Sequence, residues 1–135
     1  MSTILVGTDT SAAADLAVED AARLARDRGA ELLILYVRGS SDLQAVVDPA
    51  RAADPAGYLA HMATRFPDVA TRTMVETGDP ADRIVRVAEQ EGVETIVLGN
   101  RDVHGRWWRV RDSVANIVLR HSPCSVFIID TRRAQ

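Results

Sequence analysis

The sequence contains no lysine, and all sixteen of its basic side chains are arginines. The missing lysine excludes Schiff-base chemistry, a lysine general base and a phosphate-binding loop of the GxxxxGK type. A single cysteine, Cys124, excludes an internal disulfide and any CxxC metal motif, and it fits a reducing cytoplasm. Aromatic residues make up only 4% of the chain, so platforms on which nucleic-acid bases stack are scarce.

Membrane and nucleic-acid partners also find little support in the sequence. No apolar run approaches the roughly 20 residues that a membrane-spanning helix needs. A strand-like run begins near Ile4, without the basic region and long apolar stretch of a signal peptide. The net charge of -3 shows no basic balance that would attract nucleic acid. We therefore expect a cytoplasmic protein with neither a membrane nor a nucleic-acid partner.

Short apolar runs alternate with stretches of helical spacing along the whole chain. The length of 135 residues and the apolar content of 47% suit a single domain over residues 1–135. Asp54-Pro55 and Asp79-Pro80 each predict the start of a helix. Residues 38–53 are expected as a loop, with or without one helical turn, and the expected strands are 3–8, 31–37, 69–76, 95–98 and 125–129.

This alternation predicts an α/β fold with one doubly wound, five-stranded parallel sheet and helices on both faces. We expect the strand order 3-2-1-4-5, in which the first strand is central and residues 69–76 form a half-exposed edge. Ligands of such sheets bind beyond the carboxyl ends of the strands, where the winding reverses. The loops that begin at Gly7 and Gly99 should therefore form the binding site.

Both loops resemble those of universal stress proteins. The opening ILVGTDTSAAADLAVEDAARLA is similar to the start of that family, with Asp9 directly after the first strand. The family hallmark is a glycine, two residues, a second glycine, nine residues, then glycine and a serine or threonine. Gly99, Asp102 and Asp112-Ser113 match its spacing, and LRHSPCSVFII resembles the stretch that follows. The resemblance covers essentially the whole chain.

The resemblance implies an adenine-nucleotide site. It places Asp9 near the adenine and ribose, and Val37 against the adenine. It also implies that Ser113 supplies a phosphate-binding hydroxyl. Asp9 has a second interpretation, as a simple cap of the first helix. Gly7 stands where many ATP binders have proline. The full set of expected binding residues is Gly7, Thr8, Asp9, Val37, Leu98, Gly99, Asp102, Asp112, Ser113 and Val114.

Asp102 and Asp112 stand where ATP-binding members of the family carry glycine. A Cβ atom hinders the close approach of backbone to phosphate. Each carboxylate also repels a polyanion, by about 4 kcal/mol for unit charges about 4 Å apart at an effective dielectric near 20. We therefore expect a dimeric stress-response regulatory module with weak or lost ATP binding. The alternative is a functional ATP- or AMP-binding protein whose loop arginines (Arg101, Arg106, Arg109 and Arg111) hold the phosphates.

Other site types have weaker support. An enzyme of the wider adenine-nucleotide α-hydrolase group is a third interpretation, but the sequence offers no convincing nucleophile or base, so we expect no catalytic residues. Asp102 and Asp112 are more simply paired with arginine than with a metal, and none of the three histidines has a companion at metal-ligand spacing. Trp107 and Trp108 fit either stacking on a partner or packing under their loop.

The last strand also predicts self-association. Ser125 to Ile129 (SVFII) should lie at an edge of the sheet, and an apolar edge left bare invites pairing with another strand. The resemblance implies the same, because family members pair through this strand in a two-fold dimer. We therefore expect a homodimer.

Overall fold

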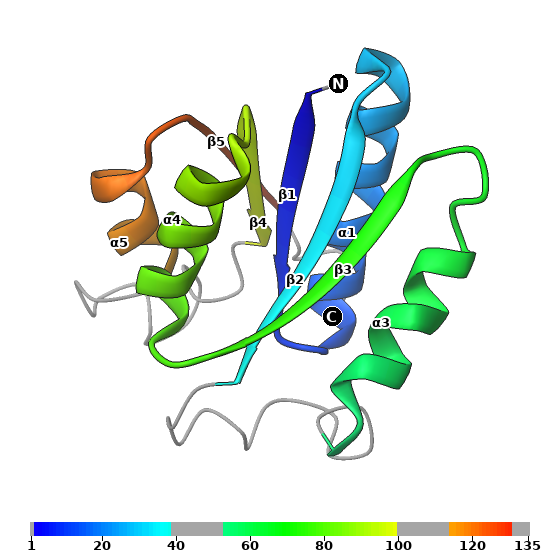
Figure 1. The fold of residues 1–135 in the computed structure, drawn as a ribbon, viewed down its shortest axis with the longest axis horizontal. Helices are drawn as coiled ribbons and strands as arrows, with labels where there is room; N and C mark the ends of the chain where they lie inside the picture. The colour runs from blue at the N-terminus through cyan, green and yellow to red at the C-terminus, as the bar shows by residue number, and fades with distance from the viewer. Residues whose placement is uncertain (1, 39–52, 100–113, 131–135) are drawn as a thin grey trace.

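The computed structural model describes residues 2–38, 53–99 and 114–130, and Figure 1 shows its fold. Strands and helices alternate along the chain as the sequence predicts. The elements are β1 (Thr3–Thr8), α1 (Ala12–Arg28), β2 (Glu31–Arg38), α3 (Pro55–Thr64), β3 (Thr71–Thr77), α4 (Pro80–Glu91), β4 (Thr95–Gly99), α5 (Val114–His121) and β5 (Ser125–Ile129).

The five strands form one parallel sheet in the order β3-β2-β1-β4-β5, which confirms the prediction (Figure 1). The central strand β1 pairs on both sides, so that Val6 lies between Ile34 of β2 and Val97 of β4. The chain winds from β1 to β2 and β3 on one side, and the crossover to β4 reverses that direction. The carboxyl ends of β1 and β4 therefore form the switch point at which such sheets bind ligands.

Apolar layers cover both faces of the sheet. Ile4 and Val6 of β1 pack against α1 and α3, whereas Leu5 faces α4 and α5, because successive strand residues point to opposite sides. All three side chains are fully buried. Burying one such side chain contributes roughly 1.5–3 kcal/mol to stability, so β1 anchors the fold beneath its exit loop.

The proline-marked helix starts are confirmed. Asp54 caps α3 by accepting a hydrogen bond from the backbone N–H of Gly57, and Asp79 caps α4 by accepting one from Asp82. Each carboxylate satisfies an N–H group that the helix itself leaves without a partner. Among the described residues, no helix is both long and apolar enough to cross a membrane.

The predicted start of the third strand is wrong by two residues. β3 begins at Thr71 rather than at Val69, because Val69 still belongs to the turn after α3. Its N–H donates to the carbonyl of Phe66 at 3.0 Å, and its own carbonyl accepts from the hydroxyl of Thr71 at 2.9 Å. Val69 is buried by this turn, not by strand alternation. β3 is an edge strand, as predicted.

Candidate functional site

The β1–α1 loop lies at the carboxyl end of the central strand. Ser11 caps α1, since its hydroxyl accepts from the N–H of Ala14 at 3.0 Å. The interpretation of Asp9 as the helix cap is therefore wrong. Asp9 lies two residues earlier, and its Oδ1 accepts from the N–H of Ser11 at 3.0 Å. This turn holds the half-buried carboxylate at the mouth of the sheet.

The backbone of this loop is strained at Thr10. Thr10 has a φ of 70°, the left-handed region that β-branched residues rarely adopt, and its side chain is completely buried. Its N–H donates to the hydroxyl of Thr8 at 3.0 Å, which helps to hold the strained conformation. Strain of this kind concentrates at binding sites, where the surrounding structure imposes it.

A buried hydrogen-bond chain joins this loop to α3. The hydroxyl of Tyr58 donates to Oδ1 of Asp15 in the first turn of α1. A phenol has only one hydrogen, so the contact of 3.3 Å between Tyr58 and Thr8 uses the threonine hydroxyl as donor. Our sequence analysis missed the polar role of Tyr58, because this residue lies within the apolar stripe of α3.

The predicted binding residues divide between the two faces of the sheet. Thr8 meets Tyr58 of α3, whereas Val37 and Leu98 pack in the layer under α4. Gly7 also faces α4: a Cβ added there would lie 3.0 Å from a methyl group of Leu98 and 3.4 Å from one of Ile84. The missing side chain thus lets Leu98 pack across the central strand.

The phosphate half of the predicted site is only partly described. Gly99 ends β4 and Val114 begins α5, and both are half-buried. Asp102, Asp112 and Ser113 lie outside the described residues, and the same holds for the loop arginines and tryptophans. The roles assigned to those residues stay predictions.

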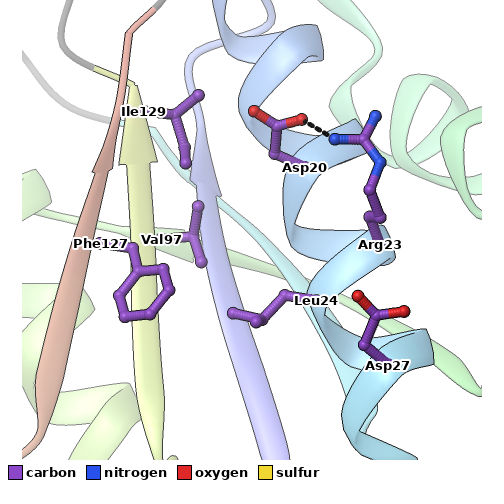
Figure 2. A pocket seen from close by; sticks show the side chains of 7 residues that line it. All are labelled: Asp20, Arg23, Leu24, Asp27, Val97, Phe127 and Ile129. Carbon is purple, nitrogen blue, oxygen red and sulfur yellow. Dashed lines mark hydrogen bonds and ion pairs between the residues drawn. The ribbon is translucent and has the colours of Figure 1, made fainter.

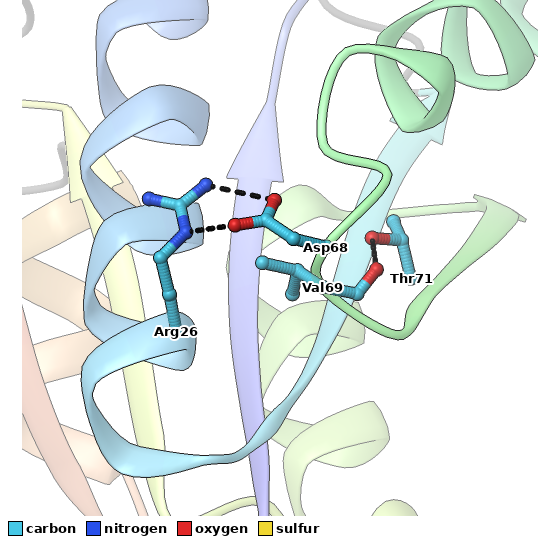
Figure 3. Close-up of polar contacts among 4 residues, drawn as sticks. All are labelled: Arg26, Asp68, Val69 and Thr71. Atoms are coloured by element: carbon cyan, nitrogen blue, oxygen red, sulfur yellow. Dashed lines mark hydrogen bonds and ion pairs between the residues drawn. The ribbon is translucent and has the colours of Figure 1, made fainter.

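Arginines at the amino end of the sheet are paired with carboxylates. Figure 3 shows Arg26 of α1 donating two hydrogen bonds to Asp68. The hydrogen bond from Arg26 is the main reason that the pKa of Asp68 lies below its usual value. Arg72 of β3 likewise bridges Glu31 at 2.9 Å and Glu91 at 2.7 Å, and those hydrogen bonds raise the pKa of its guanidinium.

The carboxyl end is different. Arg83 of α4 and Glu76 of β3 are half-buried there, and neither forms an ion pair with any described residue. In the part of the chain that the structure describes, no three His, Cys, Asp or Glu side chains gather as a metal site. The carboxyl end therefore combines a strained loop, an ordered carboxylate and charged side chains that have no ion-pair partner among the described residues.

A sequence model described as "Universal stress protein family" matches residues 1–130. The chain belongs to the universal stress protein family. A universal stress protein of Methanothermobacter thermautotrophicus is 38% identical over 69 residues, which is 48% of this chain. That match spans 44% of the relative, less than half of its length.

Solved universal stress proteins share the fold. One in complex with cAMP has a TM-score of 0.80 and 26% identity, with 96% of this chain and 97% of that chain covered. A family member from Burkholderia pseudomallei has a TM-score of 0.72 and 30% identity, with 95% of each chain covered. The agreement over nearly the whole chain extends to the sheet and both of its helical layers.

A shallow apolar groove lies beside the edge strand β5 of this universal stress protein. Figure 2 shows Phe127 and Ile129 of β5 facing Leu24 of α1 across Val97. Asp20 and Arg23 form an ion pair of 2.7 Å at its rim. The side chains of Phe127 and Ile128 are 40% and 36% exposed, so apolar surface continues along both sides of this edge.

Proposed function

We propose that this universal stress protein is a dimeric regulatory module that binds adenine nucleotides with one phosphate in preference to ATP. The carrying observation is the pre-ordered switch point at β1, where Asp9 is held by the N–H of Ser11 and Thr10 is kept in a strained conformation. A site ordered before binding loses less entropy when the ligand arrives. The cAMP complex of a structural neighbour supports the choice of a monophosphate.

The preference against ATP follows from charge. Asp102 and Asp112 replace glycines of the family hallmark, and a triphosphate brings more negative charge toward them than a monophosphate does. The adenosine half has no such penalty, since Val37 offers an apolar contact and Asp9 an acceptor for ribose or base. The proposed role is binding rather than catalysis, and the proposed setting is the cytoplasm, where the free Cys124 stays reduced.

Calorimetric titration with ATP, ADP, AMP and cAMP tests the proposal. We expect AMP or cAMP to bind at least tenfold more tightly than ATP. Two double variants then separate the causes: Asp102→Asn with Asp112→Asn removes the charges and keeps the Cβ atoms, whereas Asp102→Gly with Asp112→Gly removes both. Each double variant should strengthen ATP binding, and the glycine pair more. Low-micromolar ATP binding by the unmodified protein, unchanged in both variants, contradicts the charge argument.

The arginine-rich loop supports a second candidate function, an ATP-binding protein of different geometry. Arg106, Arg109 and Arg111 carry enough positive charge to neutralise both aspartates. In that case, changing these three arginines together to glutamine should weaken ATP binding. The loss should be about tenfold or more for each hydrogen bond to a phosphate that disappears. Under our first proposal the same change leaves AMP binding nearly unaltered, because AMP relies on the adenosine half.

Dimerisation through β5 is proposed from its position at the sheet edge and from its exposed apolar side chains. A second copy of the strand would satisfy the unpaired backbone groups and cover Phe127 and Ile128.

In analytical ultracentrifugation, Ile128→Asp should shift the protein to monomers, because the new charges face each other across a two-fold axis. Val75→Asp is the matched control on the opposite edge strand, where the side chain is 38% exposed. A monomeric unmodified protein at micromolar concentration contradicts the proposal.

A further inference from the structure

Two charged side chains at the carboxyl end of the sheet form no ion pair within the described part of the chain. Glu76, in β3, and Arg83, in the first turn of α4, are both half-buried. Neither makes a side-chain hydrogen bond or an ion pair with any described residue, and they do not pair with each other. By contrast Arg86, about one helical turn further along α4, pairs with Asp82 at 3.0 Å.

The sheet register places Glu76 beside Val37, and Arg83 lies over the turn that follows Glu76. Glu76 is the direct partner of Val37 in the β2–β3 ladder. Met74 packs in the layer under α4, as Val37 does, so Glu76 two residues later points to the same side. Arg83 reaches that side too, because its Nε lies 3.0 Å from the position that a Cβ on Gly78 would occupy. An acceptor beside Val37 and a donor beside Gly78 thus lie on the same face of the sheet, two residues apart along β3 and its exit turn.

The placement of Arg83 is unfavourable for stability. Its Nε is buried without a hydrogen-bond partner, which carries the desolvation penalty of a polar group. A cation in the first turn of a helix also opposes the positive end of the helix dipole. Residues that break such local rules without a structural benefit are expected at functional sites.

We propose that Glu76 and Arg83 recognise the edge of the adenine base that Val37 contacts, an inference that rests on the proposed function. The major-groove edge of adenine presents the 6-amino donor next to the N7 acceptor, and inosine keeps this N7 acceptor. Glu76 accepts from the amino group, and a terminal nitrogen of Arg83 donates to the ring nitrogen. The two residues therefore select adenine over bases that carry a keto oxygen in place of the amino group.

Calorimetric titration with AMP and inosine monophosphate tests this assignment, because the inosine nucleotide replaces the amino group by a keto oxygen. The unmodified protein should prefer AMP at least tenfold. In Glu76→Gln the preference should fall close to one, because the glutamine amide can turn and donate to the keto oxygen. Arg83→Gln should weaken AMP binding about tenfold, the effect of losing one hydrogen bond to a charged group.

Two control variants separate recognition from general charge effects. Glu89→Gln changes an exposed carboxylate on α4, and Arg120→Gln changes an exposed arginine of α5 that likewise lacks a partner among the described residues. Both should keep the preference of the unmodified protein.

The ligand-free Tm of Glu76→Gln and Arg83→Gln should not fall, as it would for structural residues. Unaltered AMP preference in both variants overturns the inference and leaves the proposed function intact, whereas failure of the unmodified protein to bind any of these nucleotides overturns both.

Discussion

The two ends of the sheet use charge in opposite ways. At the amino end, arginines are neutralised: Arg26 pairs with Asp68, Arg28 with Glu94, and Arg72 with two glutamates. At the carboxyl end, Asp9 and Asp79 are occupied by backbone N–H groups, while Glu76 and Arg83 lack described partners. The ion pairs of Arg26, Arg28 and Arg72 thus join separate elements at the amino end of the sheet, whereas the proposed binding groups lie at the carboxyl end.

The physical reason lies in the direction of the strands. In a parallel sheet every crossover returns the chain to the same end, so helix ends and strand starts meet at the amino end and can be joined by ion pairs. The carboxyl ends open into loops around the switch point, where a ligand needs unpaired groups. Binding sites of this kind are less stable than they would be if every group were satisfied.

The largest difference in stability between the two ends of the sheet is expected from glycine replacements. Gly78 at the carboxyl end has a φ of 137°, and a Cβ there would meet Nε of Arg83 at 3.0 Å. Gly29 at the amino end has a φ of 62° with nothing within 4 Å of an added Cβ. We expect Gly78→Ala to lower the free energy of unfolding by about 2–3 kcal/mol and Gly29→Ala by about 1 kcal/mol.

Urea unfolding of both variants measures the difference. A double variant, Gly78→Ala with Arg83→Ala, removes the contact between the new Cβ and Arg83 but keeps the backbone strain at residue 78. It should recover only part of the loss. Equal effects at Gly78 and Gly29 would show that the carboxyl end is no more constrained than a helix terminus.

Tyr58→Phe, at the carboxyl end, should have an intermediate effect on stability. It removes the hydroxyl that joins Thr8 of β1 to Asp15 of α1 while the ring stays buried. We expect a loss of about 1–2 kcal/mol in the free energy of unfolding, because a hydrogen bond to a carboxylate disappears from a partly buried site.

A double-mutant cycle of Tyr58→Phe and Asp15→Asn tests whether that loss comes from the shared bond. The combined loss should be smaller than the sum of the single losses. Strictly additive losses would mean that the two side chains do not act together.

The smallest effect is expected at the exposed ion pair of Arg26 and Asp68. The folded pKa of Asp68 is depressed, so its contribution to stability is present above its unfolded value, near 3.8, and is lost as pH falls through the folded pKa. Asp68→Asn should therefore be slightly less stable than the unmodified protein at pH 7, and the two should converge in strong acid.

Urea midpoints at several pH values, at low and high salt, measure this difference. High salt should reduce the stability difference between Asp68→Asn and the unmodified protein, because salt screens exposed ion pairs. A stability difference that persists below the folded pKa would show that the asparagine acts through packing or the unfolded state instead.

Sequence analysis predicted much of the scaffold but only part of the site. Helix starts at Asp54 and Asp79 were predictable because a short side chain followed by proline encodes a cap locally. The cap of α1 was not, because Asp9 and Ser11 both suit that role and only the path of the loop selects Ser11. The start of β3 was misplaced because the buried Val69 imitates a strand residue.

The alternation of strands and helices and the family can be read from the sequence, since apolar period, caps and hallmark spacing are local properties, and the strand order follows from the usual pattern of a doubly wound sheet. Only the tertiary structure decided which face each site residue occupies and which charges are left unpaired. The strand register sets Glu76 beside Val37, and the turn at Gly78 lies under the side chain of Arg83. Such contacts between distant segments depend on packing that no local pattern records.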